Sequence, residues 1–191
     1  MINKIIKKTI AALNEQQNGK LLSKDYVLAD KTPTEDVLAF IKKLRPQHVG
    51  IDLMRMGSDK DGGYLVPDDT EGIKACFSPG VNKVSEFEMD CHKRQLKIFL
   101  ADKSVDKPRL DLNESEYHFL KKFVGCLNND DFITLDDWAA MMDTEAGEEL
   151  MLQMDIEGAE YVTLINTSEA LLKSFRIVVL EIHSLQKLWN Q

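Results

Sequence analysis

A glycine turn and an acidic residue stand at a spacing that suits ribose binding. The apolar segment 73–78 runs into the turn Ser78-Pro79-Gly80, and the apolar segment 97–101 is followed by Asp102. In Rossmann-like nucleotide-binding units, an acid about 20 residues after the glycine turn accepts hydrogen bonds from the ribose hydroxyls. A carboxylate suits this task because its oxygens only accept. Gly80 and Asp102, which are 22 positions apart, therefore predict nucleoside binding.

The sequence of the turn indicates which nucleoside. Turns that bind dinucleotides read GxGxxG, because the later glycines let the backbone approach a pyrophosphate and let the helix pack closely. Here the turn reads PGVNKV, with one glycine, and no GxxxxGK[ST] loop occurs in the sequence. A ligand with a ribose but no phosphate fits better, and S-adenosylmethionine (SAM) is the common one. An NAD-dependent oxidoreductase is a disfavoured alternative.

Polar residues also follow two other apolar segments. Segment 150–154 leads into Asp155 and Glu157, and the run IVVLEIH ends on Glu181 and His183. Ligands of open α/β sheets bind outside the carboxyl ends of the strands. We therefore predict Asp155 and His183 as the catalytic residues, either of which could act as a general base. The structural alternatives are a turn at Asp155, a charge at a helix N-terminus for Glu157 and a structural histidine.

Asp155, Glu181 and His183 could also form a set of metal ligands. Glu181 and His183 share one face of a strand, but both must clear the strand end to reach a common ion. Strand alternation counts against the full set, so we predict no metal site and keep a metal-assisted reaction as an alternative.

The run FITLDDW marks a helix start. Thr134 and Asp137 have the spacing of a capping box, with Asp in place of the usual Glu. In the functional alternative, Asp136 or Asp137 faces the amino group of an adenine. We therefore keep Asp136 as a candidate cofactor-binding residue.

Apolar segments of strand and helix type alternate along the main body of the chain. This alternation predicts parallel βαβ units and a doubly wound, mainly parallel α/β sheet. Ahead of the units we expect a hairpin at 50–67 and N-terminal helices at 2–17 and 34–44, the latter with Thr34 as N-cap. Helix 2–17 could pack on its own domain or bind a membrane surface or a partner. The expected strands are 73–78, 97–101, 117–124, 150–154 and 176–182, and the expected helices are 84–95, 135–142, 159–165 and 168–174.

Composition and charge exclude several classes of protein. The 191 residues are 43% hydrophobic and 29% charged, which is typical of a globular domain. No apolar run approaches the roughly 20 residues of a transmembrane helix, and the lysines near the N-terminus leave no secretory apolar region, so we expect a cytoplasmic protein. Residues 1–45 hold 9 Lys and Arg against 5 Asp and Glu, whereas residues 46–191 hold 15 against 27. This acidic body argues against nucleic acid as a partner. Three scattered cysteines predict buried, reduced thiols.

Six motifs follow one another along the chain, namely MRMGSDKDGGYLVPDD, FSPGVNKVSEFEMD, FLADKSVD, ITLDDW, MDIEGAEYVTL and IVVLEIH. In this order they resemble the FkbM-type SAM-dependent methyltransferases, which have a Rossmann-like class I fold. The resemblance covers residues 46–191, after an N-terminal helical extension at 1–45. It implies that Ser78, Gly80 and Val81 line the methionine and ribose of SAM and that Asp102 holds the ribose. It further implies that Asp136 lies near the adenine and Asp155 near the transferred methyl group. Asn82 departs from the pattern, since many members have a second glycine there.

The resemblance implies an enzyme that methylates an oxygen of a sugar or another small hydroxylated acceptor. Class I methyltransferase sheets usually end in an antiparallel hairpin beside the fifth strand, and the sequence ends soon after that strand. We therefore expect a fragment that lacks the last strands, or a fold in which the early hairpin compensates. A catalytically inactive nucleoside-binding or interaction module of the same fold is the alternative function.

Overall fold

The computed structural model describes residues 32–81, 85–142, 144 and 147–185. The chain divides into two units, one formed by 1–47 with 185–191 and the other by 48–184. The expected helix at 2–17 lies outside the described residues. No described helix combines the length and the apolar character that a membrane span requires.

The described helix of the first unit is α2, Thr34–Lys43. Its N-cap residue is Pro33 and no side chain caps the helix, so the prediction of Thr34 as N-cap is wrong. The helix N-terminus is instead balanced by Glu35 and Asp36 in the first turn, which complement the helix dipole.

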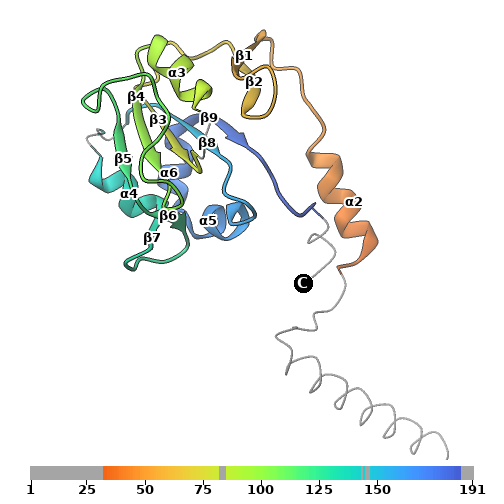
Figure 1. The fold of residues 1–191 in the computed structure, drawn as a ribbon. Coiled ribbons are helices and arrows are strands. Elements are labelled where there is room, and N and C mark those ends of the chain that lie inside the picture. The colour runs from red at the N-terminus through yellow and green to blue at the C-terminus, as the bar shows by residue number, and fades with distance from the viewer. Residues whose placement is uncertain (1–31, 82–84, 143, 145–146, 186–191) are drawn as a thin grey trace, which may run out of the picture. The chain divides into compact units, whose positions relative to one another are not determined.

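The second unit is built on a five-stranded parallel sheet (Figure 1). In space the strands are ordered third, second, first, fourth and fifth along the chain, which is the order of Rossmann-like nucleotide-binding sheets. The predicted α/β class with a parallel sheet is therefore confirmed. The strands, in spatial order, are β5 (His118–Leu120), β4 (Lys97–Ala101), β3 (Ala75–Pro79), β8 (Leu150–Met154) and β9 (Phe175–Leu180).

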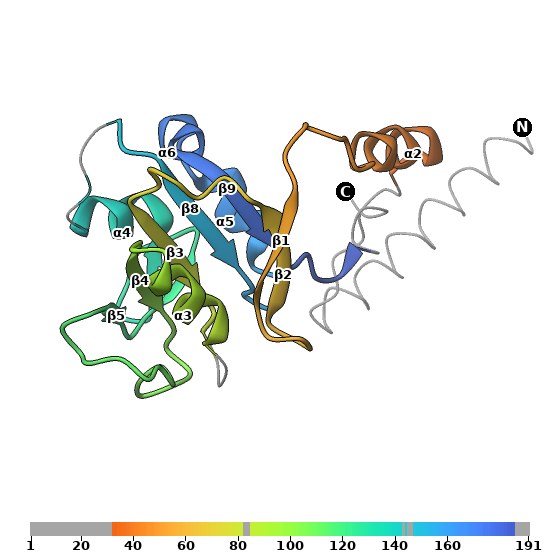
Figure 2. The same cartoon turned by 90° about the horizontal axis from the view of Figure 1, so that it is seen from above.

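Both faces of this sheet are covered by other elements (Figure 2). Successive side chains of a strand point to opposite faces of the sheet, so each face has a hydrophobic core of its own. On β3, Phe77 packs with Trp138 of α4 (Leu135–Met141), while its neighbour Cys76 lies in the core that holds Phe87 of α3 (Glu86–Lys93). β3 and β8 are buried along their whole length, as expected for central parallel strands. The first face carries α4 (Leu135–Met141), α5 (Glu160–Asn166) and α6 (Glu169–Ser174), and the second carries α3 (Glu86–Lys93) and the antiparallel hairpin of β1 (Leu53–Gly57) and β2 (Gly63–Pro67).

The expected single strand at 117–124 is wrong. The chain turns after β5, where the N–H of Lys122 donates to the carbonyl of Leu120 at 2.8 Å. The rest of the segment becomes β6 (Phe123–Gly125), which pairs in parallel with the unpredicted β7 (Phe132–Thr134) in a small separate sheet. Two strands of three residues give too short an apolar pattern to be read from sequence.

The three cysteines are free thiols, but they differ in exposure. Cys76 and Cys91 are buried between β3 and α3, as predicted. Cys126 is exposed, so its predicted burial is wrong. It follows directly on β6, where the chain leaves the small sheet.

Candidate functional site

The carboxyl ends of the parallel strands are joined by backbone hydrogen bonds just beyond the strands themselves. Each of four residues that follow a turn or strand end donates its N–H to the end of the neighbouring strand. The polar residues predicted from sequence are thereby placed in a row along one edge of the sheet. The bonds run from Asp102 to Leu120 (3.1 Å), from Gly80 to Ala101 (3.0 Å), from Asp155 to Pro79 (3.4 Å) and from Glu181 to Met154 (3.0 Å).

Gly80 lies where the backbone after β3 is in close contact with the backbone after β8. Its φ of +88° lies in the left-handed region, and a Cβ built on it would lie 1.7 Å from the carbonyl oxygen of Asp155. Only glycine fits both requirements. This contact lies between the first and fourth strands along the chain, where the strand order reverses direction. In open α/β sheets that crevice is where ligands bind.

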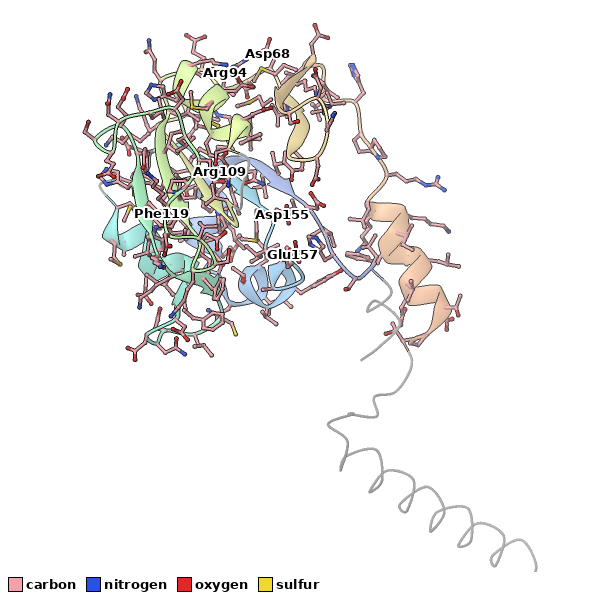
Figure 3. All side chains as sticks on the ribbon, in the orientation of Figure 1. Asp68, Arg94, Arg109, Phe119, Asp155 and Glu157 are labelled. Atoms are coloured by element: carbon pink, nitrogen blue, oxygen red, sulfur yellow. The ribbon has the colours of Figure 1, made fainter. Side chains whose placement is uncertain are left out.

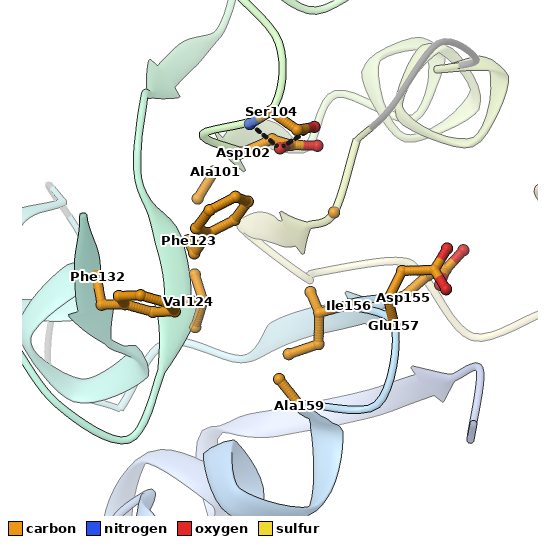
Figure 4. Close-up of a pocket in the computed structure, with 11 residues that line it drawn as sticks. Ala101, Asp102, Ser104, Phe123, Val124, Phe132, Asp155, Ile156, Glu157 and Ala159 are labelled. Atoms are coloured by element: carbon orange, nitrogen blue, oxygen red, sulfur yellow. Dashed lines mark hydrogen bonds between the residues drawn. The ribbon is translucent and has the colours of Figure 1, made fainter. Parts of the chain in front are cut away.

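A cavity of about 420 Å³ opens at this place (Figure 4). Its size falls in the range of small-molecule sites, roughly 300–1,000 Å³. Gly80 and Asp102 lie on its sheet side, and Phe123 and Phe132 supply an apolar wall from the small sheet. The remaining lining residues are Ala101, Ser104, Val124, Asp155, Ile156, Glu157 and Ala159.

The structure brings three of the predicted site residues to this cavity, namely Gly80, Asp102 and Asp155. Asp102 is 5% exposed, and its Oδ1 accepts from the N–H and the hydroxyl of Ser104, both at 2.7 Å. These two bonds fix the carboxylate at the cavity wall. The sequence does not predict Ser104 as a site residue, because a serine two residues after an acid, as in this Asx-type turn, is not a distinctive pattern.

The other three predicted cofactor-binding residues are not among those that line the cavity. Val81 is buried in the core with α3. Oδ2 of Asp136 accepts from the N–H of Ser168 at 2.9 Å, at the start of α6. Thr134 caps helix α4 as predicted, since its hydroxyl accepts from the N–H of Asp137 at 3.2 Å and donates to its carboxylate at 2.8 Å. The reciprocal bond of a capping box is not formed, because the N–H of Thr134 donates to Oδ1 of Asn128 at 2.9 Å and not to Asp137.

Ser78, the third of these residues, is fully buried beneath the turn. Its hydroxyl lies within hydrogen-bond distance of Oε1 of Glu88 and 2.7 Å from Oε1 of Gln153. One hydroxyl carries one hydrogen and can donate to only one of these oxygens. A protonated Glu88 satisfies both contacts by donating to Ser78, which then donates to Gln153. Burial raises the pKa of Glu88, which favours that protonated form.

We expect the stability of the protein to reflect this buried acid. Below the ordinary Glu pKa of 4.5, Glu88 is protonated in both the folded and the unfolded chain. As the pH rises above that value, the unfolded chain ionises first. The free energy of unfolding of the wild type relative to Glu88→Gln should then fall, by up to about 1.4 kcal/mol per pH unit, until the folded pKa is passed. Urea denaturation of both proteins between pH 4.5 and 8 measures this difference. Glu86→Gln, at an exposed position of the same helix, is measured alongside as the control for removing a carboxyl group from this helix. A difference for Glu88→Gln that does not fall as the pH rises would show that Glu88 is not held protonated.

The second group of polar residues surrounds His183, beyond the end of β9. Nδ1 of His183 lies 3.0 Å from Oε1 of Glu160. Its Nε2 faces three carboxylates, with 3.7 Å to Asp155, 3.7 Å to Glu157 and 3.9 Å to Glu181. The structure thus brings the two predicted catalytic residues together. Figure 3 shows Asp155 and Glu157 side by side at the carboxyl edge of the sheet.

Asp155, Glu181 and His183, the ligand set of the metal-assisted alternative, converge in the structure. One ligand atom from each of these residues lies within 4.8 Å of the other two. Strand alternation does not apply, because β9 ends at Leu180 and both Glu181 and His183 follow it.

Glu160 is the functional candidate that the sequence did not reveal. Its side chain is fully buried, and Oε1 also accepts from the N–H groups of Ile156 and Gly158, at 3.0 and 3.1 Å. Burial alone would raise the pKa of Glu160, but these hydrogen bonds and the one to His183 lower it overall. Glu160 therefore fixes both the loop after β8 and the ring of His183. Its only sequence signal is an acid two residues after a turn glycine, at the start of a helix.

The charges in this group shift the pKa of its members. Burial, and then the charge of Glu181, raise the pKa of Asp155 to about 6. The hydrogen bond to Glu160 raises the pKa of His183, and the charges of Glu160, Asp155 and Glu157 add to this effect. Carboxylates crowded this closely favour any positive charge placed among them.

Two tyrosines hold the segment after β9 in place. The hydroxyl of Tyr64 on β2 donates to Oε2 of Glu181 at 2.9 Å, and burial together with this bond raises the pKa of Tyr64. The hydroxyl of Tyr161 on α5 donates to the carbonyl of His183 at 2.9 Å. The hairpin thus takes part in positioning Glu181, a contact between segments more than 100 residues apart that sequence patterns do not reveal.

Comparisons of this chain with protein-family models, with curated proteins and with solved structures found no match. The resemblance to FkbM-type methyltransferases therefore stays a prediction from the motifs. The function has to be argued from the cavity and from the residues around His183.

Proposed function

We propose that this chain is a methyltransferase that binds SAM in the cavity at the carboxyl edge of its sheet and methylates an oxygen of a small hydroxylated acceptor. The observation that carries the proposal is the charge of the cavity. Its charged lining residues among those described are three acids, Asp102, Asp155 and Glu157. At neutral pH, SAM carries a sulfonium and an ammonium against one carboxylate, so it is a net cation and is attracted by such a wall.

The same charge disfavours a dinucleotide. A pyrophosphate brings two negative charges that would face the acidic wall. The turn at Gly80 also offers no second glycine with which to approach phosphate oxygens. A ribose, by contrast, presents hydroxyl donors, and the Asp102 carboxylate at the end of β4 is an acceptor of the kind they need.

The reaction is an in-line displacement. The acceptor oxygen forms a bond to the methyl carbon, the bond from that carbon to sulfur breaks, and its electron pair stays on sulfur. The hydroxyl proton passes to a base, for which Asp155 at the cavity wall and His183 beside it are the candidates. The protein contributes mainly by positioning the reactants, and the acidic wall serves the charged cofactor.

Titration calorimetry with SAM tests the cofactor. We expect the folded wild type to bind SAM and Asp102→Ala to bind it more weakly by about 1.5–3 kcal/mol, roughly 10- to 150-fold in Kd, because hydrogen bonds to a charged acceptor are lost. Asp59→Ala, in the turn between β1 and β2 with a fully exposed side chain, is the control and should bind like the wild type. A wild type that unfolds cooperatively but shows no heat of binding with SAM would contradict the proposal.

A second assay separates an active enzyme from an inactive module of the same fold. The wild type is incubated with SAM and a panel of sugars and other small alcohols, and S-adenosylhomocysteine and methylated products are followed by mass spectrometry. Products that depend on both SAM and an alcohol support transfer. Tight SAM binding without any product across the panel would favour a binding module.

A further inference from the structure

Beyond SAM binding, the residues after β8 and β9 form a constellation suited to a metal ion. We propose that Asp155, Glu181 and His183 bind one divalent transition-metal ion at the edge of the cavity. Their ligand atoms lie within 4.8 Å of one another, a separation that a central ion with bonds of about 2.0–2.2 Å can bridge after small side-chain rotations. The two carboxylates and the imidazole come from the ends of adjacent strands, so the backbone of the sheet presents them together.

Asp155 combines an unpaired polar atom with uncompensated negative charge around it. Oδ1 of Asp155 is buried and has no hydrogen-bond partner among the described residues. Around it stand the carboxylates of Glu157, Glu160 and Glu181, all near His183. Within the described part of the chain, no lysine or arginine forms an ion pair with any of these four acids. A bound cation would stabilise a buried acceptor atom that is surrounded by negative charge in this way.

The ring of His183 is oriented in the way that a metal ligand requires. Glu160 is fully buried and accepts two backbone N–H bonds, so its Oε1 is an acceptor fixed in place. In the neutral imidazole, which is the form that binds a metal, Nδ1 of His183 donates to it, and the lone pair of Nε2 is directed at the carboxylates of Asp155 and Glu181. Metal-binding histidines show this same arrangement, in which a carboxylate behind the ring sets the tautomer and the direction of the ligand atom.

The carboxylate of Glu181 is also held in position by a neighbouring side chain. Oε2 of Glu181 accepts from the hydroxyl of Tyr64, whereas Oε1 is the atom that lies 3.9 Å from Nε2 of His183. The tyrosine thus holds the carboxylate with one oxygen turned to the histidine. Both the imidazole and this carboxylate have a supporting partner outside the ligand set.

The types of ligand atom limit which metal ions suit the site. One imidazole with two carboxylates suits Mn²⁺, Fe²⁺ or Zn²⁺ better than Mg²⁺ or Ca²⁺, which prefer oxygen alone. Three protein ligands leave coordination positions open. The chemical use of the ion rests on the proposed function, since an acceptor hydroxyl bound at an open position would have a lower pKa and could release its proton to water without Asp155 or His183 acting as base.

Mn²⁺ is the probe for the test, because its aqueous paramagnetic resonance signal disappears when it is bound. The full chain, stripped of metal with chelator and without SAM, is titrated with MnCl₂. We expect one site per chain and a weakening of more than about tenfold in each of Asp155→Asn, Glu181→Gln and His183→Gln. His92→Gln is the matched control, because His92 also lies beside a carboxylate, with 3.4 Å from its Nε2 to Glu116, but outside the constellation. It should bind Mn²⁺ like the wild type.

A direct readout keeps the proposal testable if a variant fails to fold. Electron spin-echo modulation of the wild type with Mn²⁺ should show nitrogen from a coordinated imidazole, and His92→Gln should keep that signal. The proposal is overturned if the folded wild type binds no Mn²⁺ stoichiometrically, if bound Mn²⁺ shows no nitrogen, or if the control loses as much affinity as the three ligand variants.

The test also separates this proposal from the proposed function. Mn²⁺ binding is measured without SAM, and SAM binding is measured in chelator. Mn²⁺ binding without SAM binding would support the metal site and contradict the methyltransferase. The reverse result would contradict the metal site alone.

Discussion

Gly80→Ala is expected to lower the free energy of unfolding by about 3–5 kcal/mol. Part of this cost, about 1–2 kcal/mol, comes from holding alanine in a left-handed backbone conformation at φ +88°. The rest comes from the new methyl group, which would stand 1.7 Å from the carbonyl oxygen of Asp155. The contact is with backbone on both sides, so no side chain can rotate away. The ends of β3 and β8 must separate instead, although the N–H of Asp155 is bonded to Pro79 between them.

Gly50→Ala separates the two parts of this cost. Gly50 also has a positive φ, +77°, but a Cβ on it would meet nothing within 4 Å. It should therefore lose only the conformational part, about 1–2 kcal/mol. Urea denaturation of both variants measures the difference. If the two variants lose the same amount, the close approach of Gly80 to Asp155 is not a feature of the folded protein.

The five-stranded sheet was largely predictable because its four longer strands, all except the three-residue β5, each carry a local signal. Phe77 and its neighbours on β3, and Leu152 and its neighbours on β8, are continuous apolar runs, which central parallel strands require. The small sheet was not predictable, because Phe123 and Phe132 belong to strands of three residues whose pairing depends on the turn after Leu120. Local patterns reveal long buried elements and miss short ones that tertiary contacts stabilise.

The site was predictable where the topology alone fixes it. Gly80, Asp102 and Asp155 follow three adjacent strands, so the parallel order of those strands places them at one edge. The family resemblance implies that Ser78 lies at the ligand, yet it lies beneath the turn with Glu88. Whether a residue at a strand end faces the ligand or the core depends on the exact residue at which the strand stops. That register is set by packing, which a sequence pattern does not contain.

Glu160 was not predictable because its role depends on burial. The motif MDIEGAE shows an acid at a helix start, where most acids are exposed and only complement the helix dipole. Here the side chain of Glu160, the first residue of α5, is buried beneath the loop and contacts the ring of His183. An acid that accepts from two backbone N–H groups and a ring nitrogen is a structural centre of the site.

Glu160→Ala is expected to lower the free energy of unfolding by about 3–5 kcal/mol, because it breaks a buried charged network and leaves its donors without an acceptor. The N–H groups of Ile156 and Gly158 would lose their partner in a loop where Glu157 already has a φ of +57°. Urea denaturation at pH 7 measures the loss.

Two further variants show whether the network is the cause. Glu160→Gln keeps an acceptor oxygen for both N–H groups and should lose clearly less than Glu160→Ala, since only the charge of the acceptor changes. Glu169→Ala, in the first turn of α6, removes an exposed acid whose ion pair is with Lys173 at i+4. Such pairs contribute about 0.3–0.5 kcal/mol, so this variant should stay close to the wild type. If Glu160→Ala is no less stable than Glu169→Ala, the buried carboxylate does not hold the loop, and the orientation of His183 must have another cause.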